Sequence, residues 1–292
     1  MNHTRRILVA GSIALSLLTA GAATAANKIA VTASFSILGD LVQAVGGERV
    51  NVTTLVGPNQ DAHSFDPKPG DIKALAGAQM LVTNGLHFEP WAAKLAKSAG
   101  FKGETVVASA GVKARPSDPH AWQNPNNVIQ YVRNIAAGLS RADASGAATY
   151  QANAEAYVKE LQALDTWAKA QFADIPVVKR KVITSHDAFG YFSAQYMVKF
   201  LAPQGINTET EPSARQVATL IKQIQREKIK AVFVENMSNP KLIEQLSKDA
   251  GATVGASLYS DALSGPDQPG STYLQMMRHN VTQLAAGMKL NQ

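Results

Sequence analysis

The sequence alternates between strand-like and helix-like segments, and one long stretch without any strand pattern interrupts this alternation. Short runs of apolar and β-branched residues, each followed by an amphipathic segment, occupy residues 28–109 and resume at residue 181. Such alternation is typical of β/α units that build a parallel sheet covered by helices. We therefore predict an α/β fold with two blocks of β/α units.

The expected elements follow from the spacing of apolar residues, which is continuous in buried strands and three or four residues apart in helices. The predicted strands are 28–34, 50–56, 79–85, 104–109, 181–185, 229–236 and 253–259. The predicted helices are 35–47, 71–78, 88–100, 188–197, 212–228, 239–251 and 272–289. The two blocks have the same organisation but share no sequence repeat.

The stretch without a strand pattern covers residues 125–173, and its apolar spacing predicts a long helix. Its second part places six residues at three- and four-residue spacing: Tyr150, Ala154, Tyr157, Leu161, Leu164 and Ala168. A helix of about 25 residues or more would be close to 40 Å long and would link the two blocks rigidly. An ordinary helix packed inside one domain is the alternative. The predicted organisation is an N-terminal lobe over 26–145, a linking helix over 146–174 and a C-terminal lobe over 175–292.

The first 25 residues have the composition of a secretory signal peptide. Arg5 and Arg6 precede an apolar run over 7–20, and the small residues 23–25 offer a cleavage site. A membrane anchor is the alternative, but this run is short for a bilayer span, which takes roughly 20 residues. We expect cleavage after Ala25 and export of the mature chain.

The chain contains no cysteine, which argues against disulfides, thiolate metal sites and a lipid anchor on an N-terminal cysteine. Export without such an anchor favours the periplasm, and a chain of this size has enough core to fold without disulfides. The net charge of +6 becomes +4 when Arg5 and Arg6 leave with the signal peptide. A charge this small, without a Lys/Arg-rich stripe, does not indicate a nucleic-acid partner.

Three histidines and one aspartate share a setting in the predicted fold. His63 and Asp261 follow predicted strands after short loops, and His186 follows one directly. His120 lies in a proline-bounded loop before the long helical stretch. In open α/β sheets, ligands bind at the carboxyl ends of the strands. Because each block contributes two of these residues, a cleft between the blocks would bring them together.

The other histidines are distinguished by their position. His3 belongs to the predicted signal peptide, and His279 lies in a predicted helix among polar neighbours. His87 lies in a loop after a predicted strand. We expect His279 at the surface and keep His87 as a weaker candidate for a binding site.

The donor set of His63, His120, His186 and Asp261 is three imidazoles and one carboxylate. Such a set suits Zn²⁺ and also accepts Mn²⁺ or Fe²⁺. Each has an ordinary alternative, since loop histidines are commonly solvated and Asp261 can cap a turn. Their separations of 57, 66 and 75 residues match no short zinc motif. Asp61, Asp118 and Glu235 are candidate hydrogen-bond partners for the imidazoles, with turn or cap roles as the alternative.

Seven motifs together resemble the zinc/manganese-binding (cluster A-I) solute-binding proteins of bacterial ABC importers. In the family's order, along nearly the whole mature chain, they are GPNQDAHSFDPKPGDI, NGLHFEPW, DPHAWQNPNN, TSHDAFGYF, ETEPSARQ, VFVEN and LYSDALS. The resemblance implies two lobes of parallel sheet flanked by helices, joined by one long backbone helix, with a transported metal ion buried between them. It also implies that the metal ligands are His63, His120, His186 and Asp261.

The same resemblance implies a monomeric, non-enzymatic protein that delivers its ion to a cognate ABC permease in the inner membrane. Some members carry Glu at the position of His186 and often bind manganese or iron, so the imidazole favours Zn²⁺, as does the affinity order. Many zinc-specific members carry a His-rich loop, which this chain lacks. We expect Zn²⁺ first and Mn²⁺ second, with Fe²⁺ as a further alternative.

Two other functions are compatible with these residues. A secreted zinc-dependent hydrolase would use the three histidines as ligands and Asp261 or Glu235 as a base. The chain has no HExxH motif, however, and a fourth ligand leaves water no coordination position. A metal-binding adhesin, a role proposed for some relatives, would need surface display, which the missing lipid-anchor cysteine disfavours.

Overall fold

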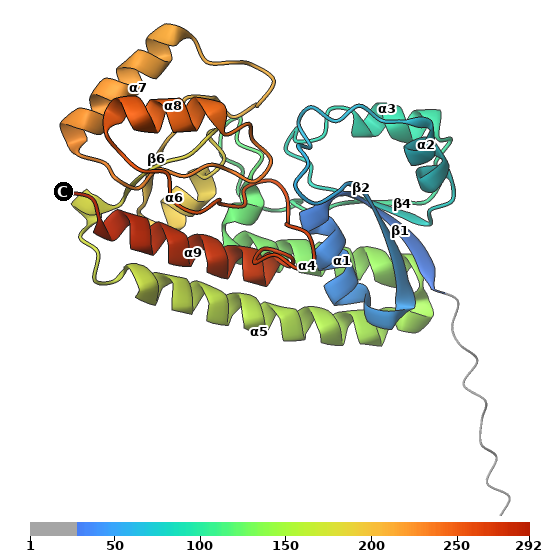
Figure 1. Cartoon of the computed structure of the whole chain (residues 1–292). Helices are drawn as coiled ribbons and strands as arrows, with labels where there is room; N and C mark the ends of the chain where they lie inside the picture. Colours follow the sequence, from blue (N-terminus) through green and yellow to red (C-terminus); the bar gives the residue numbers. More distant parts are fainter. Residues whose placement is uncertain (1–27) are drawn as a thin grey trace, which may run out of the picture.

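Two α/β lobes lie side by side along one long helix, α5, which spans Ala147–Phe172 (Figure 1). This computed structural model describes residues 28–292, and the predicted signal peptide lies outside that range. The predicted α/β fold with two lobes of parallel strands is confirmed. Among residues 28–292, none of the helices combines the length and hydropathy of a membrane span.

The N-terminal lobe is built on a regular parallel sheet with the strand order β2-β1-β3-β4. The strands are β1 (Ile29–Phe35), β2 (Val50–Val56), β3 (Met80–Thr83) and β4 (Glu104–Val107). Within β1, Val31 pairs with Val52 on one side and with Met80 on the other. β1 is buried along almost its whole length, as expected for a strand whose sheet is covered on both faces. All four strands lie where the sequence predicts them.

The helices of this lobe begin at local sequence signals. They are α1 (Ser36–Gly46), α2 (Pro69–Ala76), α3 (Ala92–Ser98) and α4 (Pro125–Ala142). Pro69 occupies the first turn of α2, and Asp71 accepts a hydrogen bond from the backbone N–H of Lys68 at 2.7 Å. Asn124 caps α4 with its side-chain oxygen. These two helix starts end the loops that leave β2 and β4, where two candidate ligands lie.

The predicted helical stretch over 125–173 consists of α4 and α5, which are separated by a 3-10 turn. Asp143 ends α4, and its carboxylate accepts hydrogen bonds from Arg49 and Tyr150, each at 2.7 Å. The six residues predicted to line one face of α5 are all buried. The helix packs against α1 and α4 of the N-terminal lobe and against α9 (Tyr273–Lys289) of the C-terminal lobe. The linking helix is therefore packed against both lobes along its length.

The C-terminal lobe has shorter strands and four helices. β5 (Lys181–Ile183) pairs in parallel with β6 (Lys199–Leu201). The sequence did not predict β6 as a strand. The helices are α6 (Gly190–Tyr196), α7 (Ala214–Glu227), α8 (Lys241–Ala250) and α9. Ser213 caps α7 and forms a capping box with Gln216, which confirms the predicted helix start.

The predictions of continuous strands over 229–236 and 253–259 are wrong. These segments form single parallel bridges, which pair Val232 with Val254 and Glu235 with Leu258. Between the two bridges, the first segment advances by three residues and the second by four. The second segment therefore has one extra residue, which interrupts the pairing as in a β-bulge. The interruption lies a few residues before the candidate ligand that follows the second segment.

Two buried apolar clusters form the interior. The larger one extends from the N-terminal sheet through α1, α4 and α5 to α6 and α9, and so continues from one lobe into the other. The smaller one lies in the C-terminal lobe, between β5, α7 and α8. The two lobes therefore share a continuous core.

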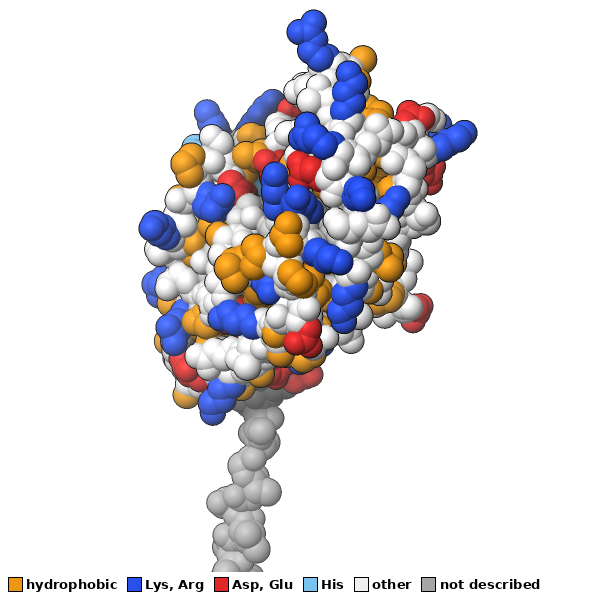
Figure 2. All heavy atoms as spheres, turned by 90° about the vertical axis from the view of Figure 1, so that its left-hand side faces the viewer, with side chains coloured by type: hydrophobic (Ala, Val, Ile, Leu, Met, Phe, Trp, Pro, Cys, Tyr) orange, Lys and Arg blue, Asp and Glu red, His pale blue; other side chains and the backbone are white. Residues whose placement is uncertain are grey.

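The end face of the C-terminal lobe, at the left of Figure 1, carries scattered Lys and Arg side chains around a small group of apolar ones (Figure 2). Exposed apolar residues of this lobe include Val178, Met197 and Leu290. The basic side chains on this face do not form a continuous stripe (Figure 2). The absence of a nucleic-acid partner stays a prediction from the sequence.

Candidate metal centre

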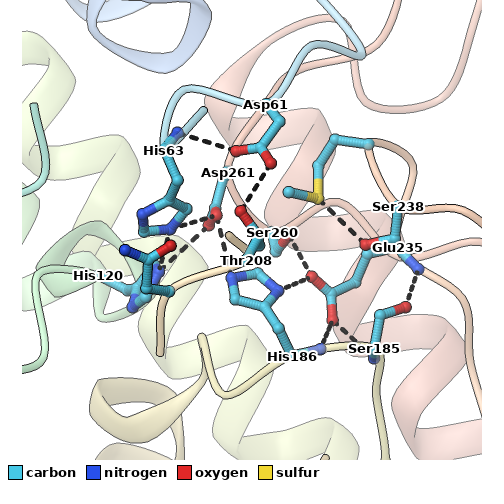
Figure 3. Close-up of polar contacts among 12 residues, drawn as sticks. Asp61, His63, His120, Ser185, His186, Thr208, Glu235, Ser238, Ser260 and Asp261 are labelled. Atoms are coloured by element: carbon cyan, nitrogen blue, oxygen red, sulfur yellow. Dashed lines mark hydrogen bonds and ion pairs between the residues drawn. The ribbon is translucent and has the colours of Figure 1, made fainter. Parts of the chain in front are cut away.

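Four residues from the two lobes converge between them: His63, His120, His186 and Asp261 (Figure 3). His63 lies in the loop from β2 to α2, and His120 in the connection from β4 to α4. His186 follows β5, and Asp261 follows the segment that is bridged to Glu235. One potential ligand atom from each residue lies within 4.8 Å of the others. The fold thus brings together all four residues that the sequence singles out.

The Asp261 carboxylate lies among the three imidazoles. Its Oδ2 is 3.1 Å from Nε2 of His186 and 3.3 Å from Nε2 of His63. Its Oδ1 is 3.7 Å from Nε2 of His120, and the Nε2 atoms of His63 and His120 are 3.3 Å apart. Four ligands placed tetrahedrally at about 2.0–2.1 Å from Zn²⁺ would lie roughly 3.3 Å from one another. The three distances among Asp261 Oδ2, His63 and either neighbouring imidazole, 3.1, 3.3 and 3.3 Å, are close to that value, whereas His120 is 3.7 Å from the other carboxylate oxygen.

The cluster is closed to solvent. His120, His186 and Asp261 are fully buried, and His63 is 7% exposed. Within residues 28–292, neither carboxylate oxygen of Asp261 meets a hydrogen-bond donor in suitable geometry. Buried polar atoms normally have such partners. The donor atoms of Asp261 are therefore available to a cation.

Burial and neighbouring charges act in opposite directions on the pKa values. Burial disfavours the charged form of Asp261, but His120 and His186 outweigh it and hold the pKa of this carboxyl well below its usual value. Burial also opposes the charging of His186, yet Glu235 and Asp261 raise its pKa well above the usual value. The pKa of His120 is raised because Asp261 and Asp118 outweigh the same burial effect. The metal-free cluster thus holds protons that a metal ion would displace.

Asp118 orients His120. Its Oδ1 is 2.9 Å from Nδ1 of His120 and accepts the backbone N–H of the same residue at 3.0 Å. An imidazole held at Nδ1 by a carboxylate presents Nε2 to a metal. The start of α6 approaches the same carboxylate at Gly190, where a Cβ atom would collide with Asp118 Oδ2. The glycine therefore leaves room for the residue that orients His120.

Glu235 has the corresponding role for His186 and makes more contacts. Its Oε2 is 2.5 Å from Nδ1 of His186 and accepts the hydroxyl of Ser260 at 2.6 Å. Its Oε1 accepts the backbone N–H groups of Ser185 at 2.8 Å and of His186 at 2.9 Å (Figure 3). Glu235 and Asp118 therefore both make the imidazole contacts that the sequence suggested.

Asp61, the third suggested imidazole partner, contacts other groups. Its Oδ1 accepts the backbone N–H of His63 at 2.8 Å, and its Oδ2 accepts the hydroxyl of Thr208 at 2.7 Å. Thr208 belongs to the C-terminal lobe. The suggestion that Asp61 bonds an imidazole is therefore wrong: Asp61 links the backbone of the His63 loop to the other lobe.

Aromatic side chains support the N-terminal half of the cluster. The ring of Phe88 lies edge-on to His63, with ring centres 4.8 Å apart, and packs against Trp122 at 4.7 Å. Trp122 and Gln123 both donate side-chain hydrogen bonds to the carbonyl of Ser260, at 2.8 and 2.7 Å. Ser260, the residue before Asp261, is thereby joined to the N-terminal lobe by buried hydrogen bonds.

The Ser and Thr residues that contact the carboxylates of Glu235 and Asp61 were not identified from the sequence. Ser260 and Thr208 contact them through the hydroxyl, and Ser185 does so through its backbone N–H. Ser185 and Ser260 each directly precede a candidate ligand, in TSHD and YSDA, and this adjacency was the available signal. Thr208 lies 147 residues from Asp61 in the chain, and no sequence pattern connects the two.

His87 and His279 lie outside the cluster. His87 is exposed, in a turn where its φ is 64°. His279 is half-buried on α9, and its Nε2 is 2.8 Å from the carbonyl oxygen of Ser257. His87, the weaker candidate from the sequence, is therefore not part of this site, and His3 lies outside the described residues.

Known proteins resemble this chain over most of its length. The family described as "Zinc-uptake complex component A periplasmic" matches residues 31–287. The metal ABC transporter substrate-binding lipoprotein ScbA of Streptococcus cristatus is 33% identical, covering 91% of this chain and 90% of that protein. The manganese-binding lipoprotein MntA of Halalkalibacterium halodurans is 33% identical, with 88% of each protein covered. The solved periplasmic zinc-binding protein TroA from Treponema pallidum has a TM-score of 0.86 at 25% identity, covering 90% of this chain and 99% of TroA.

Proposed function

Because the chain belongs to the periplasmic zinc-uptake component A family, whose members serve ABC importers as metal-binding proteins, we propose that it captures Zn²⁺ in preference to Mn²⁺. The ligands in this proposal are His63, His120, His186 and Asp261. The loaded protein delivers the ion to a cognate ABC permease in the inner membrane. Its role is binding and transfer, as in the related substrate-binding proteins, and not enzymatic catalysis.

One observation carries the assignment of the ligands. Three imidazole nitrogens and a carboxylate oxygen lie within 4.8 Å of one another, in a buried site where the carboxylate has no other hydrogen-bond donor within residues 28–292. A buried carboxylate is costly unless a positive charge compensates it, and in the metal-free protein the imidazoles of His120 and His186 supply that charge. A four-coordinate metal ion would take over the compensation when it displaces their protons.

Zn²⁺ is proposed first because of the donor set and the affinity order. Sites of nitrogen and oxygen ligands generally bind Zn²⁺ more tightly than Mn²⁺, and imidazole suits Zn²⁺ well. His186 is the position where an oxygen ligand would favour Mn²⁺ or Fe²⁺. The names of the relatives include both metals, with TroA named for zinc and MntA for manganese. Mn²⁺ is therefore the second candidate.

Capture fastens the two lobes to each other. His63 and His120 belong to the N-terminal lobe, and His186 and Asp261 to the C-terminal lobe, so one ion bound to all four joins them. Since α5 packs against both lobes, we propose that opening involves small movements of loops or lobes and not a wide hinge. In this scheme a monomer in its closed, loaded form docks on the permease.

The proposed location is the periplasm, reached through cleavage of the signal peptide 1–25. Relatives carry names of both kinds, lipoprotein for ScbA and periplasmic protein for TroA. Mass spectrometry of the exported protein separates these cases. We expect an unmodified mature chain that begins at Ala26, and an added lipid mass would contradict the proposal.

The metal assignment is tested by competition calorimetry on metal-free protein, with Zn²⁺ and Mn²⁺ titrated separately in the presence of a chelator. We expect tighter binding of Zn²⁺, and His186→Glu should narrow the difference between the two metals because it replaces a nitrogen ligand with oxygen. His87→Gln, which changes an exposed histidine outside the cluster, serves as the matched control. Tighter binding of Mn²⁺ by the unaltered protein would show that the preference for zinc is wrong.

A further inference from the structure

A buried cluster needs a way for its ion to enter. His63 is the most exposed of the four proposed ligands, at 7%, and the other three are fully buried. A polar cavity of about 280 Å³ adjoins the cluster, and its lining includes Asp61, Ser185 and Thr208. Ser185 directly precedes His186, and Asp61 lies two residues before His63. The cavity therefore borders the segments that carry one proposed ligand from each lobe.

Asp61 lines this cavity and contacts the loop that carries His63. One of its oxygens accepts the backbone N–H of His63 at 2.8 Å, and the other accepts the hydroxyl of Thr208 at 2.7 Å (Figure 3). Resting on the proposed function, we propose that the Asp61–Thr208 hydrogen bond is a latch between the lobes that sets how fast metal enters and leaves the site. Asp61 is then a positioning residue that controls the movement of His63 and is not itself a ligand.

The segments on both sides of the latch are loops. His63 lies in a loop between β2 and α2, and Thr208 lies in the connection 202–213, which contains neither helix nor strand. The Thr208 loop is tied to the His186 segment, because the backbone N–H of Asp187 donates to the carbonyl of Gly205 at 3.2 Å. The latch thus connects the His63 loop to the segment of His186. When it opens, His63 is free to move away from the cluster.

Other bonds between the lobes stay in place when the latch opens. The bonds from Trp122 and Gln123 to the Ser260 carbonyl are buried and involve neither Asp61 nor Thr208. Asn59 receives a side-chain bond from Asn236 at 2.8 Å, and its backbone N–H donates separately to a carbonyl of the C-terminal lobe. Opening the latch therefore moves the His63 loop without separating the lobes.

The test is stopped-flow kinetics with Zn²⁺ alone, measuring association with the metal-free protein and release from the loaded protein into excess EDTA. In Thr208→Val the hydroxyl is lost at nearly constant volume. We expect association and release each to accelerate about tenfold, which corresponds to roughly 1.4 kcal/mol in the barrier, while the dissociation constant changes less than threefold. Thr208→Ser restores the donor and should return both rates to those of the unaltered protein.

Two further variants make the result specific. Asp61→Ala combined with Thr208→Val should be no faster than Asp61→Ala alone, since Thr208 has no bond left to lose once the Asp61 carboxylate is gone. Asn59→Gly removes a different side-chain bond between the lobes and tolerates the positive φ of 56° at that residue, so its rates should stay unchanged. Unchanged rates in Thr208→Val, or faster release with unchanged association, would overturn the latch. Failure of the unaltered protein to bind Zn²⁺ or Mn²⁺ would instead overturn the proposed function.

Discussion

The two lobes hold their halves of the cluster with different kinds of bonding. The N-terminal lobe has continuous parallel ladders, whereas the C-terminal lobe has two strands of three residues and otherwise single bridges. Buried polar side chains bind the backbone where the C-terminal ladders are missing. Asn291 shows this most fully, since its Oδ1 accepts the N–H groups of Lys230 and Ala231. Its Nδ2 donates to the carbonyls of Lys179 and Lys181.

Asn280 and Glu235 make comparable contacts closer to the cluster. Asn280 on α9 accepts the N–H of Tyr259 at 2.9 Å and donates to its carbonyl at 2.6 Å. Glu235 binds two consecutive backbone N–H groups and the ring of His186. The C-terminal half of the cluster therefore depends on a few side chains that each satisfy several groups. Substitutions there should change stability and metal affinity together, while the N-terminal sheet persists when one side chain is lost.

The largest expected effect is loss of a ligand from either lobe. Asp261→Ala and His63→Ala should each weaken Zn²⁺ binding by more than about a hundredfold, because substitution of residues that only orient ligands already costs about 10–100-fold. Asp261→Ala should be the more severe, since its carboxylate faces all three imidazoles. Competition calorimetry measures both, with the exposed Asp267→Ala as control. A loss below tenfold for either variant would remove that residue from the proposed ligand set.

The next largest effect is expected from loss of either carboxylate that orients an imidazole. Glu235→Ala and Asp118→Ala should each reduce affinity by about 10–100-fold. Only the first should also lower the free energy of unfolding of the metal-free protein strongly, by about 1–3 kcal/mol, because it leaves two backbone N–H groups and the hydroxyl of Ser260 without their acceptor. Calorimetry and urea denaturation give the two quantities. Equal losses of stability in both variants would show that the lobes do not differ in this respect.

Metal binding should weaken in acid, by up to about tenfold per displaced proton for each pH unit below the raised imidazole pKa values. The raised pKa of His186 means that its imidazolium stabilises the metal-free fold below the unfolded-state pKa, and this contribution is lost as pH rises through the folded-state pKa. The lowered pKa of Asp261 preserves its carboxylate until pH falls through that low value. Zn²⁺ should therefore raise the melting temperature more at alkaline than at acidic pH, and calorimetric scans measure this. An increase that is independent of pH would argue against proton displacement.

The smallest effect is on stability alone. Asn291→Ala should lower the free energy of unfolding by about 1–3 kcal/mol, because it leaves buried backbone groups without partners. Asn134→Ala in the N-terminal lobe removes donors from the carbonyls of Ala108 and Ala110, and it should cost less because the bond to Ala110 is exposed. Neither change should affect Zn²⁺ affinity. If the Asn134 variant proved the less stable of the two, the proposed dependence of the C-terminal lobe on side chains would be wrong.

The sequence predicts the regular parts of the fold because their patterns are local. The N-terminal strands and the buried face of α5 follow directly from apolar spacing. His63, His120, His186 and Asp261 can be selected because parallel strands place their carboxyl ends at one edge. Convergence of the four side chains depends only on that edge and on two lobes facing each other.

The irregular parts could not be predicted because their causes are distant in the chain. β6 is three residues long and follows a left-handed residue, Met197, so it carries no strand pattern of its own. The segments 229–236 and 253–259 have strand-like composition, but the extra residue between their bridges depends on how they pack. Asp61 bonds Thr208 across 147 residues, and only the folded chain shows that contact.

The packing of α5 against both lobes also bears on how the chain unfolds. A helix whose buried face is shared between α1, α4 and α9 loses its contacts with both lobes when either lobe comes apart. The larger apolar cluster crosses the same boundary, so neither lobe retains a complete interior after separation from the other. The two lobes should therefore melt in a single cooperative transition, and proteolytic cleavage between them should not release a stably folded half.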